Sequence, residues 1–424
     1  MVSWDDLRRE PYRILFPLAV IFGCFGVGHW LVYALGWRAS YSGFYHAWLQ
    51  VGAYMSCFIF GFLLTALPRF ASAPPASSAE LGIALGLLGV HAVGLWLRHW
   101  IVAELAFAGQ MIFLVFFAGR RFAERSRSVG PPPEFVWIGI AVVHGLLGSL
   151  LLILAQAGVL PAALIGVAKP MVQQGFVLGI VLGVAGFMAP RLMGRHTLLV
   201  RPQGVSDHHT QVIRARRTLM HLAAGALFFA SFWLEGFGWV SQAYMLRAAV
   251  ATAELLWTTQ FLRPPNLKVL YLMLLWISLW LLVCGLWGAA LVPGRRVVML
   301  HLVFLGSLSL MTFAIATMVT FSHAGQAERL QRANWPLAVV ALGILAALVS
   351  RFIAEWHPEQ FFRWLGFASI FWLAAAATWL AYLLPCMLRP PAPGSFEGVH
   401  EEAKQRLLHG HDADHGRCRR AAVS

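Results

Sequence analysis

The chain has 424 residues, of which 59% are apolar and only 12% are charged. Because soluble domains carry roughly twice that share of charge, the composition excludes a soluble globule. The formal net charge of +14 would suit a nucleic-acid partner. However, the basic residues gather on one side of the predicted membrane, so topology accounts for the charge and we expect no nucleic-acid binding.

Apolar runs long enough to cross a lipid bilayer recur along the whole chain. Hydrocarbon offers no water to backbone groups, so each run must satisfy its own hydrogen bonds, which favours helices. We therefore predict an all-α membrane protein. Its twelve transmembrane helices fall at about residues 13–36, 43–67, 79–97, 99–119, 134–157, 161–189, 217–236, 239–262, 267–291, 296–320, 335–354 and 361–387.

Three of these runs share one outline, in which a polar residue precedes a glycine by five or six places and a basic residue follows that glycine. The glycines are Gly52, Gly175 and Gly306, and the preceding polar residues are His46, Lys169 and His301. A recurrence of this kind indicates a structural unit used several times. We predict three pseudo-repeats of four helices, at about residues 13–119, 134–262 and 267–387, within a transmembrane domain of residues 1–390.

Lysine and arginine placement predicts the orientation. The side that carries the N-terminus holds 24 of the 32 lysines and arginines. By the positive-inside rule, both termini are therefore cytoplasmic. Residues 391–424 are polar, and we expect them to form a disordered cytoplasmic tail.

Two histidines are the leading candidates for cofactor ligands. His46 and His301 open corresponding helices that run in the same direction, so they should lie at one depth in the outer third of the membrane. Two neutral imidazoles so placed can supply both axial ligands of a haem. The alternative for each is an interfacial histidine hydrogen-bonded to a loop carbonyl, and the matched placement in two repeats favours ligation. The chain has no CxxCH motif, which argues for b-type rather than covalently attached haem.

Other ionisable groups within spans need partners too, because a charge in hydrocarbon costs a few kcal/mol. Lys169 holds the equivalent place in the second repeat and could face haem propionates, as could Arg247. Glu254 lies seven residues after Arg247 on the same helix face, so we expect it to be neutral or paired with Arg247, with a role in proton relay as the alternative. A second metal, haem or copper, would need some of the remaining buried histidines, for which packing is the simpler explanation. They are His29, His91, His144 and His221, of which His144 and His91 are the deepest.

The chain resembles the NnrS family, which are twelve-span bacterial membrane proteins. The resemblance lies in EPYRILFPLAVIFG near the N-terminus, HAWLQVGAYMSCFIFGFLLTALPRF from His46, and HLVFLGSLSLMTFAIATMVTFSHAG from His301. It implies haem and copper, a location in the bacterial inner membrane, and a role in denitrification and protection against nitric oxide. His46, His301 and His323 carry over as metal ligands. The second histidine and the glutamate that many members have soon after the first histidine are replaced here by Trp48 and Leu49.

We expect a haem protein that binds or senses nitric oxide, or that passes electrons, with quinol as a further candidate partner. A redox reaction is compatible with this, whereas hydrolase and NTPase motifs are missing from the sequence. Two rivals remain. Buried charges in a repeated bundle would also suit a transporter, and a factor that holds haem or copper during assembly would need the same ligands.

Overall fold

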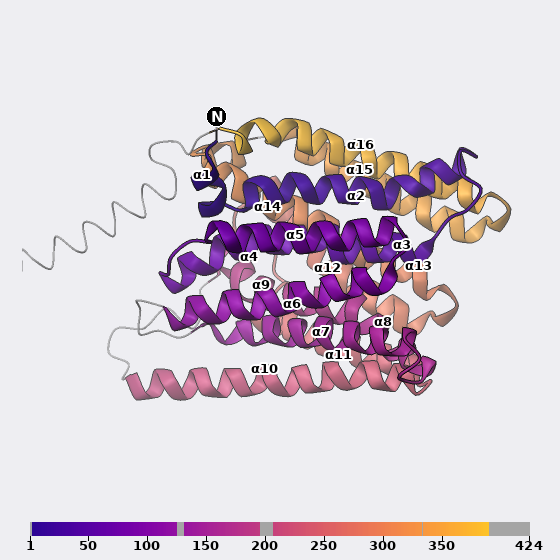
Figure 1. Ribbon diagram of the computed structural model, residues 1–424. Helices are drawn as coiled ribbons and strands as arrows, with labels where there is room; N and C mark the ends of the chain where they lie inside the picture. The colour runs from indigo at the N-terminus through magenta and orange to yellow at the C-terminus, as the bar shows by residue number, and fades with distance from the viewer. Residues whose placement is uncertain (1, 125–130, 196–206, 333, 390–424) are drawn as a thin grey trace, which may run out of the picture.

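The computed structural model describes residues 2–124, 131–195, 207–332 and 334–389. All regular secondary structure in those ranges is helical, so the predicted all-α membrane fold is confirmed. The long helices lie side by side in Figure 1. Helices α2 (Tyr12–Ala34) and α16 (Phe361–Met387) follow one edge of the bundle, and α10 (Asp207–Gly236) follows the opposite edge.

The remaining helices follow the predicted runs closely. The first third contains α1 (Trp4–Arg9), α3 (Gly43–Leu49), α4 (Ser56–Ala71), α5 (Ser78–Trp96) and α6 (Trp100–Ala123). The middle third contains α7 (Val136–Gln156), α8 (Ile165–Pro170), α9 (Val177–Leu192) and α11 (Val240–Thr259). The last third contains α12 (Leu270–Leu291), α13 (Arg296–His301), α14 (Ser309–His323) and α15 (Trp335–Trp356).

Eleven helical segments in the described ranges are long and apolar enough to cross a membrane. The long helix outside that set is α11, whose 20 residues include the charged Arg247 and Glu254. At 1.5 Å per residue α11 has the length of a span, and it packs between α10 and α12. A twelfth crossing by α11 stays a prediction, as does the side of the membrane on which the termini lie.

The three helices that carry the repeated outline are the innermost of the bundle. Between 67% and 83% of their most apolar stretch is buried, against 28–56% for the other eight spans. Each is interrupted by a π-helical segment, named η1 (Gln50–Met55), η4 (Met171–Phe176) and η6 (Leu302–Leu308). Each π-helical segment contains the glycine that aligns the repeats. A repeated unit explains why one distortion occurs three times, although the repeat boundaries stay a prediction.

The short helices before these segments lie together. In Figure 1, α3, α8 and α13 share the right-hand end of the bundle, and α1 lies at the left-hand end. We call these the far end and the N-terminal end. At the start of α3, the Ser42 hydroxyl accepts a hydrogen bond from the Tyr45 backbone N–H at 3.1 Å, which caps the helix just before His46. The predicted tail, residues 391–424, lies outside the described residues.

Close packing at the π-helical segment of the first repeat yields a test. A Cβ atom on Gly52 would overlap Nε2 of His91, whose ring is held at both nitrogens by the carbonyls of Ala103 and Trp48. We expect Gly52→Ala to destabilise the protein by roughly 1–3 kcal/mol, because the ring cannot move without losing a hydrogen bond. The measurement is thermal unfolding in detergent.

Gly89→Ala is the matched control, because Gly89 lies within a helix and has nothing near its Cβ position. That substitution should be neutral or should stabilise the helix by about 0.5–1 kcal/mol. Equal unfolding temperatures for the two variants would contradict the packing at Gly52.

Candidate functional site

A group of ring nitrogens gathers at the far end, where α2 meets α3. Nδ1 of His46 lies 2.8 Å from the backbone oxygen of Gly26, and Nδ1 of His29 lies 3.0 Å from that same oxygen. The two ring centroids are 6.0 Å apart. A neutral imidazole that donates from Nδ1 carries its lone pair on Nε2. The Gly26 carbonyl therefore selects the tautomer in which Nε2 can bind a metal.

His301 is oriented in the same way by its own helix. Its Nδ1 lies 2.7 Å from the backbone oxygen of Val297, one turn earlier. Neither His301 nor His46 makes a hydrogen bond through Nε2 to any residue in the described ranges. Metal-bound histidines in proteins usually donate their second ring N–H to a carbonyl or carboxylate in this manner.

Arg351 joins the two histidines electrostatically. Its guanidinium charge acts on both His46 and His301, and these rings also act on each other. The Arg351 side chain is buried and lies 3.3 Å from a carboxylate oxygen of Glu355, which also accepts from Arg295 at 3.1 Å. Helices α2, α3, α13 and α15 thus contribute to one far-end cluster, formed by His29, His46, His301 and Arg351.

The cation beside the two histidines is Arg351, whereas the sequence led us to expect Lys169 and Arg247 there. The structure does not bring those two residues to the cluster. Lys169 has an exposed side chain and makes no hydrogen bond to the described residues. Arg247 is fully buried among side chains of the second repeat. The position of Arg351 along its predicted span could have identified it. The residue lies in an apolar span near the far end of α15, at the depth predicted for the histidines.

Arg247 and Glu254 do not pair with each other, so of the two states expected for Glu254 the pair with Arg247 was wrong. The Arg247 guanidinium donates to Glu235 at 2.7 Å and to Gln174 at 2.6 Å. Glu254 instead lies 2.9 Å from Nδ1 of His221. Arg247 and Glu254 share α11, but each has a partner on the neighbouring helix α10. Glu235 binds Arg247 and His221 binds Glu254, so both contacts run between helices.

His91 and His144 occupy separate sites. Both nitrogens of His91 face backbone carbonyls, with Nδ1 2.8 Å from Ala103 and Nε2 3.2 Å from Trp48. His144 donates from Nδ1 to the Ile140 carbonyl at 2.7 Å, and phenylalanine rings of α10 surround it. Among the described residues, no group of three or more histidine, cysteine, aspartate or glutamate side chains could hold a metal ion.

His323 lies at the N-terminal end, remote from the far-end cluster. Its Nδ1 is 2.6 Å from a carboxylate oxygen of Glu10, which is 1% exposed. Arg13 binds the second oxygen of Glu10, and Arg69 lies 3.4 Å from the first. Glu10 thus joins α2, α4 and α14 through three basic side chains, and His323 has a structural partner.

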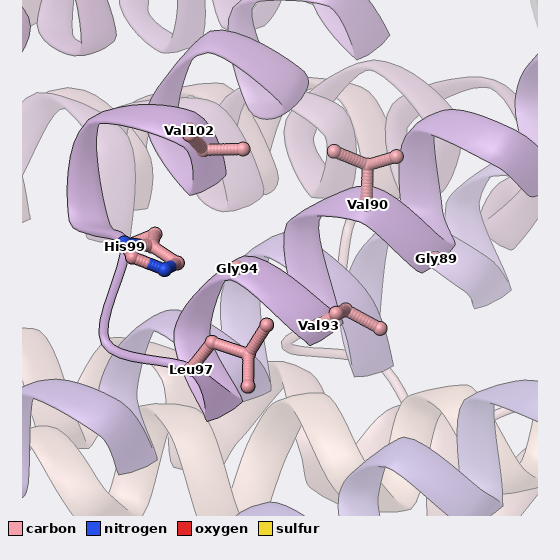
Figure 2. A pocket seen from close by; sticks show the side chains of 7 residues that line it. All are labelled: Gly89, Val90, Val93, Gly94, Leu97, His99 and Val102. Atoms are coloured by element: carbon pink, nitrogen blue, oxygen red, sulfur yellow. The ribbon is translucent and has the colours of Figure 1, made fainter.

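Two apolar hollows lie among the described residues. One, of about 100 Å³, lies between the central helices and is lined by α4, α9 and α14 through residues such as Ile59, Val181 and Met311. The other, of about 290 Å³, is a groove between α5 and α6 (Figure 2), and His99 is its polar member. The other residues lining this groove are Gly89, Val90, Val93, Gly94, Leu97 and Val102.

Fold and site together define an all-α, multi-pass membrane protein with a histidine cluster near one end of its central helices. The family model described as NnrS protein matches residues 6–390. Because the match covers most of the chain, the protein belongs to the NnrS family. No curated protein and no solved structure matches it.

The Glu10 cluster predicts a dependence of stability on pH. Burial raises the pKa of Glu10, but the hydrogen bonds and charges of His323 and Arg13 outweigh it and hold the pKa below the usual 4.5. A depressed carboxyl pKa stabilises the fold above the unfolded-state value, and this contribution disappears as the pH falls through the folded-state value. Glu10→Gln should therefore cost about 3 kcal/mol at neutral pH, because it leaves buried cations without their anion.

The measurement is unfolding of wild type and Glu10→Gln in detergent between pH 7 and pH 3. The difference between them should be constant near neutrality and should shrink below about pH 4.5. Glu124→Gln is the control, because Glu124 forms an exposed pair with Arg120 that contributes at most about 1 kcal/mol. A gap between wild type and Glu10→Gln that widens in acid would contradict this assignment.

Proposed function

We propose that this protein binds a b-type haem through His46 and His301 and acts in the nitric oxide response of a bacterial inner membrane. One observation carries the proposal. Two imidazoles on different central helices each fix Nδ1 on a backbone carbonyl and leave Nε2 without a hydrogen bond to the described residues. The helices that carry them, α3 and α13, lie at the same end of the bundle (Figure 1).

The donor set suits haem in its chemistry. Neutral imidazoles are ligands of haem iron, and the carbonyls of Gly26 and Val297 would hold the rings of His46 and His301 in the tautomer that ligation requires. When bound, the haem would supply one-electron redox chemistry. The protein supplies the ring orientation and an aromatic wall, in which the Trp30 ring lies 5.8 Å from that of His46.

Arg351 has the charge needed for the haem propionates. Its side chain is buried near both histidines. Glu355 orients the guanidinium through one hydrogen bond, from Nη1. Arg295 shares Glu355, so two cations and one carboxylate leave a net positive charge beside the site. A cation placed in this way would attract the propionates and would favour the reduced haem, which carries one positive charge fewer.

The nitric oxide role rests on membership of the NnrS family, and nitric oxide or quinol is the partner that we propose for the haem. Copper belongs to the proposal only as a second metal that His29 could help to hold, because His29 lies beside His46. Its Nε2 is buried and has no hydrogen-bond partner among the described residues, although the Ser42 carbonyl lies near the ring.

Visible spectroscopy tests the haem assignment. Full-length protein from haem-replete cells should show a Soret band and an α-band that sharpens on dithionite reduction. His46→Ala and His301→Ala should each lose most of the haem, because each removes one axial ligand. His357→Ala should keep the wild-type spectrum, because His357 is exposed and lies outside the far-end cluster.

Iron and copper analysis of the same samples identifies the metals. Colourless wild-type protein, or unchanged spectra in both ligand variants, would sink the haem assignment and would favour the transporter.

Redox titration tests the role of Arg351. Arg351→Gln removes a buried positive charge, so the oxidised haem is stabilised and the midpoint potential should fall by roughly 40 mV, equivalent to about 1 kcal/mol for one electron. Arg363→Gln is the control, because Arg363 is exposed on α16. A higher midpoint potential in Arg351→Gln would mean that Arg351 does not act on the haem in this way.

A further inference from the structure

The second repeat contains a buried histidine–carboxylate dyad, formed by His221 of α10 and Glu254 of α11. Nδ1 of His221 lies 2.9 Å from Oε2 of Glu254, and the two residues are 0% and 5% exposed. Ionisable side chains inside a membrane are costly and often mark sites that move protons. This dyad is separate from the far-end cluster, which comes from the first and third repeats.

The other nitrogen of the His221 ring is unaccounted for. Nε2 is buried and has no hydrogen-bond partner in the described ranges. Leaving such an atom unpaired costs about 1–3 kcal/mol, so a buried water is the expected partner. An imidazole with one nitrogen on a carboxylate and the other on water can accept a proton at one side and release it at the other.

Charged groups lead from the dyad toward the N-terminal end, which we predict to be cytoplasmic. Arg217 lies one turn before His221 on α10 and donates to Glu134 at 2.5 Å. The Trp257 ring lies between them, 4.9 Å from the His221 ring and 5.5 Å from the Arg217 guanidinium. The charge of Arg191 acts together with this pair. Glu134, Arg217 and Arg191 together hold two cations and one anion, so this end of the path carries a net positive charge.

Polar groups also continue toward the far end. His144 lies beyond the dyad with a second buried, unpaired Nε2, and the charge of Arg247 acts on it. Arg247 donates to Gln174, whose amide donates to the Tyr244 hydroxyl at 2.9 Å, and to Glu235. From Arg217 to Glu235, α10 rises about 27 Å, close to the thickness of the hydrocarbon core at about 30 Å.

We propose that these groups form a proton path through the second repeat, with the His221–Glu254 dyad as its relay. A proton that reaches Nε2 of His221 converts the ring to imidazolium, which then releases its Nδ1 proton to Oε2 of Glu254. The ring is left neutral with its proton on Nε2, and Glu254 becomes a neutral acid. Glu254 then releases its proton toward the N-terminal end and the ring proton returns from Nε2 to Nδ1, which restores the dyad without a change in any bond between heavy atoms. Water at the two unpaired nitrogens would complete the path.

Proton flux into liposomes tests the path without reference to haem. Full-length protein is reconstituted in phosphatidylethanolamine and phosphatidylglycerol vesicles that contain potassium and a pH-sensitive dye, and valinomycin imposes a negative interior potential. Wild-type vesicles should acidify faster than protein-free vesicles. Glu254→Gln should lower this excess flux by about tenfold or more, because the amide cannot take up the Nδ1 proton.

Glu80→Gln is the matched control. Glu80 also pairs with a buried cation, Arg121, at 2.5 Å, but no histidine is part of that pair. Its excess flux should stay within about twofold of wild type, because a glutamine preserves the helix cap that Glu80 forms with Ser77. If Glu254→Gln does not yield monodisperse protein, His221→Gln replaces it, with the same loss expected.

Two results would overturn the proton path. One is a wild-type flux equal to that of protein-free vesicles. The other is a wild-type flux in monodisperse Glu254→Gln or His221→Gln, which would leave the dyad as a structural ion pair.

Discussion

Histidine rings inside the membrane need hydrogen-bond partners, and this need determines how the polar groups of the protein are arranged. Five histidines within the bundle direct Nδ1 to a backbone carbonyl, and this contact orients each ring. What Nε2 faces then decides whether the histidine is a packing residue or can act as a ligand. In His91 Nε2 faces a second backbone carbonyl, so the ring is enclosed by the protein and acts as a packing element. In His46 and His301 it makes no hydrogen bond to the described residues, so the ring can act as a ligand.

The three central helices share a π-helical segment but have diverged around it. In the first and third repeats the polar residue before that segment is a histidine oriented by a carbonyl, and the far-end cluster results. In the second repeat the corresponding Lys169 is exposed, whereas Gln174 within the segment binds Arg247. The repeated unit therefore carries two kinds of polar site, a pair of carbonyl-oriented histidines and a chain of buried ion pairs, on one scaffold.

The helices that hold the histidine pair are also fixed at their opposite ends. Glu10 binds Arg69 at the end of α4 and His323 at the end of α14, and these helices continue from the segments that begin near His46 and His301. Between the two ends, rings from several helices pack together, including Phe58 against Phe313 with centroids 6.2 Å apart. Two rigid helices joined at one end and packed along their middle can hold ligands at the other end in a constant relation.

The sequence by itself determined the helical membrane fold, the approximate helix limits and the special status of the three repeated helices, because hydrocarbon imposes length and apolarity on each span independently. It also predicts a common depth for His46 and His301, because depth follows from position along a helix. Only the tertiary structure decided partners. Arg351 rather than Lys169 accompanies the histidines, Glu254 pairs with His221 rather than Arg247, and His323 binds Glu10. A position along a helix fixes height and face, but which neighbour lies opposite depends on how helices distant in sequence pack around one another.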